Sequence, residues 1–334
     1  MRRKMKSTYQ AILQRYLETF EESSLYEGQQ LSKSMMDIGI SPEEIVSFHI
    51  DSIKELLPHI QPELLNSFDF LLEVMIGYGL QYKEHQSLRE RQVQLYSELE
   101  VAAEMQQTLL PEVPKEIRGI DLGVLSVAAK KMSGDYYHFF QDPNGFLGVA
   151  VADIIGKGIP AALCMSMIKY AIESLPEQRL EPNAILGSIN RVVENNIDMS
   201  MFITMIYGSY DLKEHIFYYA TAGHEPGLYY SAREKKFYDL QYKGVVLGLA
   251  ADSSYKVFKQ PLEPGDLLIL FTDGVTETKK DGEFIEREDL CNLIEQKLSL
   301  SSQEMVQAIH QELLSWSHFE LEDDQTLVVI RRQV

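Results

Sequence analysis

The chain has 334 residues, of which 45% are hydrophobic, so it is long enough for two domains and a sizeable core. Its 31 basic and 50 acidic residues give a formal net charge of -19, which argues against the broad basic surface that nucleic-acid binding requires. No apolar run reaches the ~18 residues of a membrane helix, and the segment after MRRKMK is too polar for a signal peptide. Cys164 and Cys291 lack any CxxC spacing, so we expect two buried free thiols and a cytoplasmic protein.

The first 118 residues show helical periodicity almost throughout. In SPEEIVSFH, Ser41 fits an N-cap, Pro42 the first helical position and Glu44 the third residue after the cap. This capping box predicts a helix that begins at residue 42. Because no cluster of polar catalytic residues accompanies the pattern, we expect residues 1–84 to form an all-helical, non-catalytic domain.

Residues 85–118 are predicted to form a charged linker helix that ends at PEVPKE. Apolar residues recur every seven positions, at Leu88, Leu95, Ala102 and Leu109. Leu99 lies between them, but Gln92 and Gln106 occupy other seam positions, so the heptad pattern is poor and short. Two interpretations stay open: a dimeric coiled coil, or a single amphipathic helix packed on its own chain.

After Gly119 the sequence predicts an α+β fold over residues 119–334. Strand-like runs are IDLGVLSV, FLGVAVADI, MFITMIYGSYDL, HIFYYATAG, LLILF and TLVVIRR. Helical runs are LCMSMIKYAIESL, PNAILGSINRVVENNI, REDLCNLIEQKL and SSQEMVQAIHQELLSW. The strands come in adjacent pairs joined by short polar turns such as DLKEH, which indicates antiparallel sheets with helices outside.

One strand-like run, LLILF, is followed by Thr272, Asp273 and Gly274. Asp-Gly is the usual signature of a hairpin turn, but VTETKKDGE offers no clear return strand. A continuous apolar run predicts a strand covered on both faces, whose end places an acid at the rim of the sheet. This stretch alone leaves the two interpretations equally open.

Acidic residues occupy comparable places elsewhere in this half. Asp135 follows a glycine in MSGDYY, Asp153 closes GVAVAD, and Asp323 and Asp324 precede the last strand. Each acid taken singly is typical of a solvated loop, whereas four such sites favour a cluster that needs a cation. Oxygen ligands select Mg²⁺ or Mn²⁺, and no HxxH, HExxH or cysteine cluster points to zinc. A pair of such ions hydrolyses phosphate esters without a nucleophilic side chain.

Five motifs in this order resemble the PPM-type serine/threonine phosphatases of the bacterial SpoIIE group: SGDYY, DIIGKGIPAAL, TAGHEPGLYY, LLILFTDGVTE and EDDQTLVVI. The helical half is similar to a branch of this family that activates the general stress-response sigma factor, chiefly through LLEVMIGYGLQYKEHQSLR. The resemblance implies an αββα sandwich of two mainly antiparallel sheets flanked by helices, preceded by a helical regulatory and dimerisation domain.

The resemblance also implies a site with two Mn²⁺ or Mg²⁺ ions. Its expected ligands are Asp135, Asp153, the backbone carbonyl of Ile154, Asp273, Asp323 and, less typically, Asp324. Asp153 would bridge the ions, Asp273 and Asp323 would complete the first, and Asp135 would serve the second. Asp324 stands where relatives often have asparagine, so it ranks behind Asp323. Asp153 and Asp273 are the expected catalytic residues, and a metal-bound hydroxide would attack phosphoserine or phosphothreonine directly.

The chain departs from the family pattern in several places. Position 138 is His where many bacterial members have an outer acid, and no arginine obviously matches the phosphate-binding arginine of eukaryotic relatives. Lys131 and Lys157 are candidates for phosphate contact, although solvated lysines are the more typical reading. His224 in AGHEP is expected to structure its loop more than to bind metal.

By resemblance, the substrate is a small phosphorylated anti-anti-sigma protein, and the activator is a switch-protein kinase that binds the helical domain of a homodimer. The linker would convey that binding to the metal site, so the isolated enzyme would have low activity. Two rivals remain. DIIGKG loosely resembles the nucleotide box of a histidine kinase-like ATPase, and the phosphatase fold could serve as an inactive scaffold.

Overall fold

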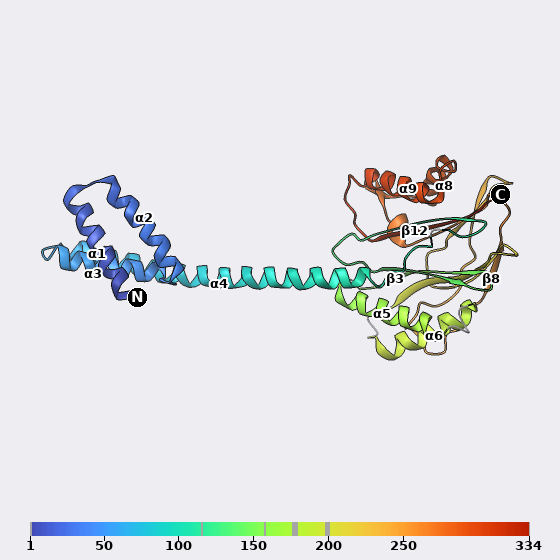
Figure 1. The fold of residues 1–334 in the computed structure, drawn as a ribbon, viewed down its shortest axis with the longest axis horizontal. Coiled ribbons are helices and arrows are strands. Elements are labelled where there is room, and N and C mark those ends of the chain that lie inside the picture. The colour runs from blue at the N-terminus through green and yellow to red at the C-terminus, as the bar shows by residue number, and fades with distance from the viewer. Residues whose placement is uncertain (1, 115, 157, 176–179, 198–200, 334) are drawn as a thin grey trace. The chain divides into compact units, whose positions relative to one another are not determined.

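The computed structural model describes residues 2–333 apart from residues 115, 157, 176–179 and 198–200. The chain divides into two compact units, Met1–Tyr96 and Ser97–Val334. Figure 1 gives the order of the helices and strands in each unit. None of the helices in the described part of the chain has the length and apolar character needed to cross a membrane.

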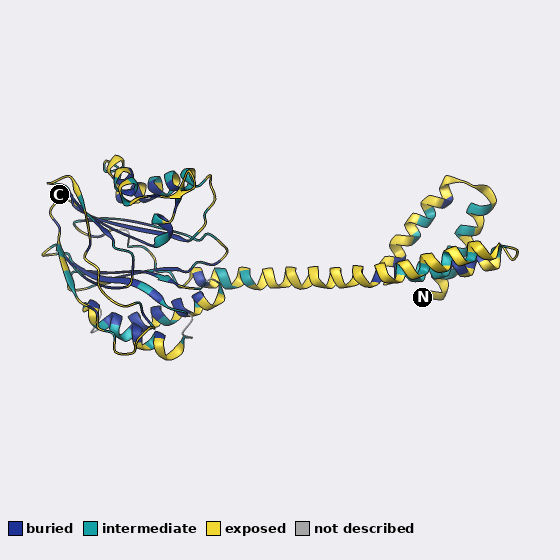
Figure 2. Ribbon diagram, turned by 180° about the vertical axis from the view of Figure 1, so that it is seen from behind, coloured by how far each residue is buried: buried dark blue, intermediate teal, exposed yellow. Residues whose placement is uncertain are grey.

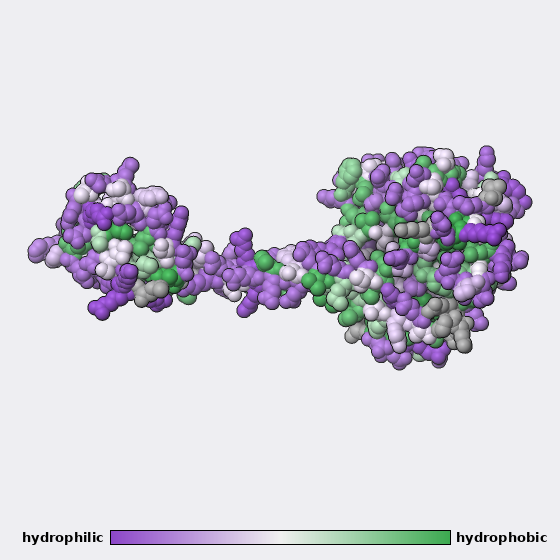
Figure 3. Space-filling view, viewed as in Figure 1, coloured by the Kyte–Doolittle hydropathy of each residue, from purple (hydrophilic) through white to green (hydrophobic). Residues whose placement is uncertain are grey.

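The first unit is helical, as the sequence predicts. It contains α1 (Arg2–Thr19), α2 (Glu22–Asp37), α3 (Pro42–Leu56) and most of α4 (Pro62–Gln107). Ser41 is the N-cap of α3, and Glu44 accepts a hydrogen bond from its backbone N–H at 3.1 Å, which confirms the capping box. Met35, Ile50 and Ile53 are among its few buried apolar side chains. Apolar surface interrupts the hydrophilic exterior of this unit (Figure 3).

The helix α4 begins in the first unit and ends in the second. Residues 80–98 are exposed, as Figure 2 shows along the middle of this helix. Leu88 is 57% and Leu95 is 59% exposed. The described part of the chain does not cover these two seam residues, whereas Leu109 at the end of the pattern packs against the core under α5 and α6.

The second unit contains two five-stranded sheets among its described residues, with orders β1-β12-β9-β6-β7 and β2-β3-β4-β5-β8. Neighbouring strands within each sheet run antiparallel. The first sheet consists of β1 (Ile120–Val127), β6 (Leu228–Ser231), β7 (Lys236–Asp239), β9 (Leu267–Phe271) and β12 (Gln325–Arg332). The second consists of β2 (Asp135–Asp142), β3 (Phe146–Ile154), β4 (Ile203–Asp211), β5 (Ile216–Ala222) and β8 (Phe258–Pro261).

Helices cover the outer face of each sheet (Figure 1). They are α5 (Ile159–Glu173) and α6 (Pro182–Asn196) on the β3 side, and α8 (Arg287–Gln296) and α9 (Ser302–Trp316) on the β12 side. One core lies between the sheets, and one lies under each helical layer. The predicted α+β fold with an αββα sandwich is therefore confirmed.

Burial on both faces explains the continuous apolar runs. Val149 and Val151 of β3 face the other sheet, whereas Ala150 and Ala152 lie under the α5 and α6 layer. All five residues of β9 are buried. The expected pair of buried thiols is only half right, because Cys164 is buried but Cys291 is partly exposed; both are free.

Candidate functional site

Asp273 and Gly274 do not form a hairpin turn. Strand β9 ends at Phe271, and Thr272 occupies the N-cap position of a short helix α7 (Asp273–Thr276). Strand β9 pairs with β12 and β6 instead of with the segment that follows it. A Cβ atom at Gly274 would lie 2.1 Å from the carbonyl oxygen of Asp324. Only glycine permits this close approach, which places the start of α7 against the segment that precedes β12.

Asp135 and Asp153 lie side by side in the other sheet. They are cross-strand partners at the ends of β2 and β3. Asp135 is only 2% exposed, and its Oδ2 accepts a hydrogen bond of 2.7 Å from the hydroxyl of Thr272. Because Thr272 follows β9, this bond ties the two sheets together at the predicted site.

Asp324 binds the loop in front of β2. Its Oδ1 accepts a hydrogen bond from the backbone N–H of Ala129 at 2.7 Å, and its Oδ2 accepts one from Gly134 at 2.6 Å. Asp323 Oδ1 accepts a 2.8 Å hydrogen bond from the backbone N–H of Asp324. The carboxylate of Asp324 is therefore occupied with shaping the loop, whereas Asp323 is only partly buried.

Oxygen atoms converge around Gly134. A Cβ atom there would lie 3.0 Å from the carbonyl oxygen of Ile154, 3.4 Å from Oδ1 of Asp153 and 3.6 Å from Oδ2 of Asp324. Such a Cβ atom would be tight against the Ile154 carbonyl and in ordinary van der Waals contact with the two carboxylates. Gly134 therefore lies beside a carbonyl oxygen and two carboxylates.

The charges in this cluster repel one another. Burial raises the pKa of the Asp135 carboxyl well above its usual value. Hydrogen bonds from Thr272 and Thr326 oppose that rise, and the nearby charges of Asp153 and Asp324 add to it. Carboxylates gathered in this way favour a cation among them.

The donor chemistry fits a hard cation, since carbonyl and carboxylate oxygens are the ligands of Mg²⁺ and Mn²⁺. Within the described residues, however, no group of three or more histidine, cysteine, aspartate or glutamate side chains is arranged to hold a metal ion. The oxygens around Gly134 include a backbone carbonyl, which such a group of side chains would not contain. The ligand set expected from the sequence therefore stays a prediction.

A second charged group lies close to Asp273. Burial raises the pKa of Glu225. The charge of Arg287 opposes this rise, and the charges of Asp273 and Asp239 add to it. The Arg287 guanidinium donates to Oδ1 of Asp239 at 2.6 Å and also to the carbonyl oxygen of Pro226. The sequence pattern did not single out Glu225 or Arg287, although Glu225 lies within the AGHEP motif. With its donors engaged in this way, Arg287 supports the Glu225 loop.

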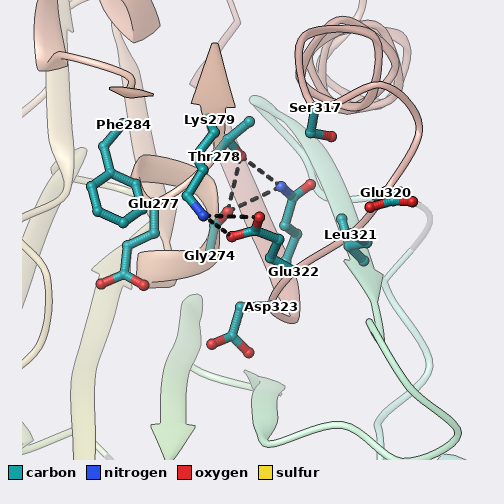
Figure 4. Close-up of a pocket in the computed structure, with 11 residues that line it drawn as sticks. Gly274, Glu277, Thr278, Lys279, Phe284, Ser317, Glu320, Leu321, Glu322 and Asp323 are labelled. Carbon is teal, nitrogen blue, oxygen red and sulfur yellow. Dashed lines mark hydrogen bonds and ion pairs between the residues drawn. The ribbon is translucent and has the colours of Figure 1, made fainter. Parts of the chain in front are cut away.

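A cavity of about 160 Å³ adjoins Asp323 and the start of α7. Lys279 Nζ donates to both carboxylate oxygens of Glu322, at 2.9 and 2.7 Å, within this cavity (Figure 4). Gln325 Nε2 donates to the carbonyl oxygen of Gly274 at 3.0 Å. Figure 4 shows the Asp323 carboxylate apart from the Lys279–Glu322 pair. Asp323 therefore lines the cavity as a partly exposed carboxylate.

The remaining sequence candidates have other partners. Lys131 forms an ion pair with Glu100 of α4, and Lys157 lies outside the described residues. His224 is buried, and its Nδ1 forms a hydrogen bond of 2.9 Å with the hydroxyl of Thr204, in keeping with a loop-structuring role. Burial lowers the pKa of His224 to about 4.

His138, which replaces the outer acid, lies in the protein core. Its Nδ1 is 3.1 Å from the hydroxyl of Tyr136, and the two rings are stacked. Both residues are buried. Position 138 therefore contributes a ring to a buried aromatic pair with Tyr136 instead of an outer acid.

Two solved structures share the architecture of the second unit. The SiaA-PP2C domain of Pseudomonas aeruginosa aligns with a TM-score of 0.64 at 20% identity, over 72% of this chain and 98% of that domain. A structure of the PP2C phosphatase domain and part of the regulatory domain of SpoIIE from Bacillus subtilis aligns with a TM-score of 0.55 at 21% identity, over 64% of each chain. These likenesses define the fold as that of a PP2C-type phosphatase.

Sequence comparison then identifies the family. Residues 143–333 match the family described as Stage II sporulation protein E, and residues 7–81 match the N-terminal domain of phosphoserine phosphatase RsbU. Phosphoserine phosphatase RsbU of Bacillus subtilis (strain 168) is 53% identical over 327 residues, which cover 98% of this chain and 97% of that protein. The chain therefore belongs to the RsbU family of phosphatases. This confirms the resemblance seen in the five motifs and favours a phosphatase over the kinase and scaffold alternatives.

Proposed function

We propose that this chain removes phosphate from phosphoserine or phosphothreonine in a small anti-anti-sigma protein, with two Mn²⁺ or Mg²⁺ ions at the rim of its two sheets. The observation that carries the proposal is the position of the Asp153 carboxylate and the Ile154 carbonyl oxygen beside Gly134, with the buried Asp135 as the cross-strand partner of Asp153. Membership of the RsbU family supports the reaction class. Release of the dephosphorylated anti-anti-sigma protein would allow it to capture an anti-sigma factor in the cytoplasm.

The proposed ligand set divides between the two sheets. Asp153, the Ile154 carbonyl and Asp135 come from the β2–β3 pair, and Asp273 and Asp323 come from the segments next to β9 and β12. When bound, the ions would supply a water of lowered pKa and charge to neutralise the phosphoryl oxygens.

The neighbouring residues have supporting roles in this proposal. Thr272 holds one oxygen of Asp135 in place through its 2.7 Å hydrogen bond. Gly134 permits the close approach of a neighbouring carbonyl oxygen. We assign Asp324 to holding the loop, because both of its oxygens already accept backbone hydrogen bonds from Ala129 and Gly134.

The helical part would receive the signal. We propose residues 1–84 as a regulatory and dimerisation domain, residues 85–118 as a linker, and residues 119–334 as a phosphatase domain. The exposed part of the linker within α4 would form a coiled coil in the dimer. An apolar groove of about 140 Å³ lies between α1 and α2, and its lining includes Leu13, Tyr16 and Leu25. Exposed apolar residues on the linker support pairing with a second helix. A switch-protein kinase that binds this domain would raise a low basal activity.

The test compares the wild type with Asp153→Asn in Mn²⁺ titrations by calorimetry and in phosphate release from a phosphorylated anti-anti-sigma protein. We expect Asp153→Asn to lower the affinity for Mn²⁺ by at least about 100-fold, more than the loss of an outer hydrogen-bond partner costs, and to abolish phosphate release. Asp252→Asn serves as a matched control, since Asp252 is exposed. Unchanged Mn²⁺ binding in folded Asp153→Asn protein would contradict the assignment.

A further inference from the structure

A buried glutamine joins the end of α4 to the loop that carries Asp135. Gln106 is only 6% exposed. Its Oε1 accepts a hydrogen bond of 3.0 Å from the backbone N–H of Ser133, and its Nε2 donates one of 2.7 Å to the carbonyl oxygen of the same residue. The amide nitrogen is also 3.2 Å from the sulfur of Met165 in α5. One side chain thus satisfies both backbone groups of Ser133, as a neighbouring strand would.

Ser133 is linked in turn to the proposed metal ligands. Its hydroxyl accepts a hydrogen bond of 3.0 Å from the backbone N–H of Asp135. The next residue, Gly134, donates its N–H to Asp324 at 2.6 Å and accepts a 3.1 Å hydrogen bond from the N–H of Ile154. The segment 133–135 is therefore held by α4 on one side and by β3 and Asp324, which precedes β12, on the other.

The α4 side of this segment borders a cavity. The cavity measures about 90 Å³, and its lining includes Gln106, Lys131, Ser133, Asp135 and Met165. The two hydrogen bonds between Gln106 and Ser133 join α4 to the segment beside this cavity. A shift of the last turn of α4 would therefore act on Asp135 through the amide of Gln106.

We propose that Gln106 is a positioning residue for the metal centre. Through its hydrogen bonds to Ser133, it couples the position of the last turn of α4 to the positions of Gly134 and Asp135. The inference rests on the proposed function, since it concerns the same centre. Glutamine suits this role because its amide offers one acceptor and one donor group, whereas leucine offers neither. Removing a direct hydrogen-bond partner of a ligand typically lowers metal affinity by about 10- to 100-fold. Gln106 acts one hydrogen bond further out, through Ser133, so we expect an effect at the lower end of that range.

The test uses the full chain and titrates Mn²⁺ by calorimetry into wild type, Gln106→Leu and Gln107→Leu. Gln107 is the neighbour on the same turn and is exposed, so it controls for the added apolar side chain. We expect Gln106→Leu to weaken Mn²⁺ binding about tenfold, with Gln107→Leu unchanged. Phosphate release should need correspondingly more Mn²⁺ but approach the wild-type rate at saturation. A purely structural role would lower the melting temperature of the metal-free protein without shifting the Mn²⁺ titration.

Each outcome decides a different claim. Wild-type Mn²⁺ affinity in folded Gln106→Leu protein would overturn the role of Gln106 and leave the proposed function standing. Absence of Mn²⁺ binding in the wild type would overturn the proposed function, and this inference with it. If circular dichroism shows that Gln106→Leu does not fold, Gln106→Asn decides by the same criterion, because its shorter amide stays polar but does not reach both groups of Ser133.

Discussion

At the scale of single residues, the site depends on groups that allow backbone and carboxylates to approach closely. Gly274 lets the start of α7 lie against the carbonyl of Asp324, and Gly134 lies beside a carbonyl oxygen and two carboxylates. Thr272 joins the two sheets through its hydrogen bond to Asp135. The order of the motifs predicted the acids. It did not predict the role of Thr272, because the partner of Thr272 is distant in the sequence and close only in the fold.

His224 makes folding depend on pH. Its pKa is lowered by burial to about 4, and the unfolded value is about 6.5. As the pH falls below about 6.5, the unfolded chain binds a proton at this position and the folded chain does not, so the protein loses stability. We expect a loss of about 2 kcal/mol in the free energy of unfolding between about pH 7 and about pH 5 from this residue.

Urea unfolding at the two pH values, compared between wild type and His224→Asn, measures this contribution. The variant removes the titrating group and keeps a polar atom near Thr204. The wild type should therefore lose about 2 kcal/mol more in its free energy of unfolding than the variant between the higher and the lower pH. Thr276→Ser serves as a control on a partly buried position that does not titrate. An identical pH dependence in wild type and His224→Asn would show that the ring is already able to ionise in the fold.

At the scale of helices and strands, the sequence predicted most strongly those elements whose pattern comes from burial. Strands β3 and β9 are covered on both faces, and their continuous apolar runs predicted them. The short strands β6, β7 and β8 were missed, because four residues give too little periodicity and β7 and β8 contain lysine and other exposed residues. The small hairpin of β10 (Lys279–Lys280) and β11 (Glu283–Phe284) was missed for the same reason. The eight-residue strand β2 was missed as well, because its sequence DYYHFFQD mixes polar and aromatic residues instead of forming an apolar run.

The linker helix leads to a prediction about signalling. Leu95 lies on the proposed seam and Val93 lies off it, and both are exposed in a single chain, at 59% and 65%. We expect Leu95→Glu to reduce activator-stimulated phosphate release about tenfold, since a charge at a seam position opposes pairing of two helices. Val93→Glu should leave stimulation within about twofold. Sedimentation and phosphate-release assays with the activator check both, and equal effects of the two substitutions would argue against a coiled coil.

At the scale of the whole molecule, the sequence predicted the fold class, the family and the order of the acidic motifs. It left the geometry of the site open, because contacts such as that of Asp324 with Ala129 join residues 195 positions apart. The role of Gln106 was also hidden, since the heptad pattern marked it only as a poor seam residue. In the fold, Gln106 is buried and forms hydrogen bonds with both backbone groups of Ser133.

The most direct test of the account is Mn²⁺-dependent phosphate release from a phosphorylated anti-anti-sigma protein, with and without the activator, for wild type and Asp273→Asn. We expect release that requires the metal in the wild type, rises with the activator and falls by at least about 1,000-fold in the variant, because Asp273 would hold an ion that neutralises the reacting phosphoryl group. Asp252→Asn should match the wild type. Release by folded Asp273→Asn protein at the wild-type rate would contradict the account and return Asp273 to a purely structural role at the start of α7.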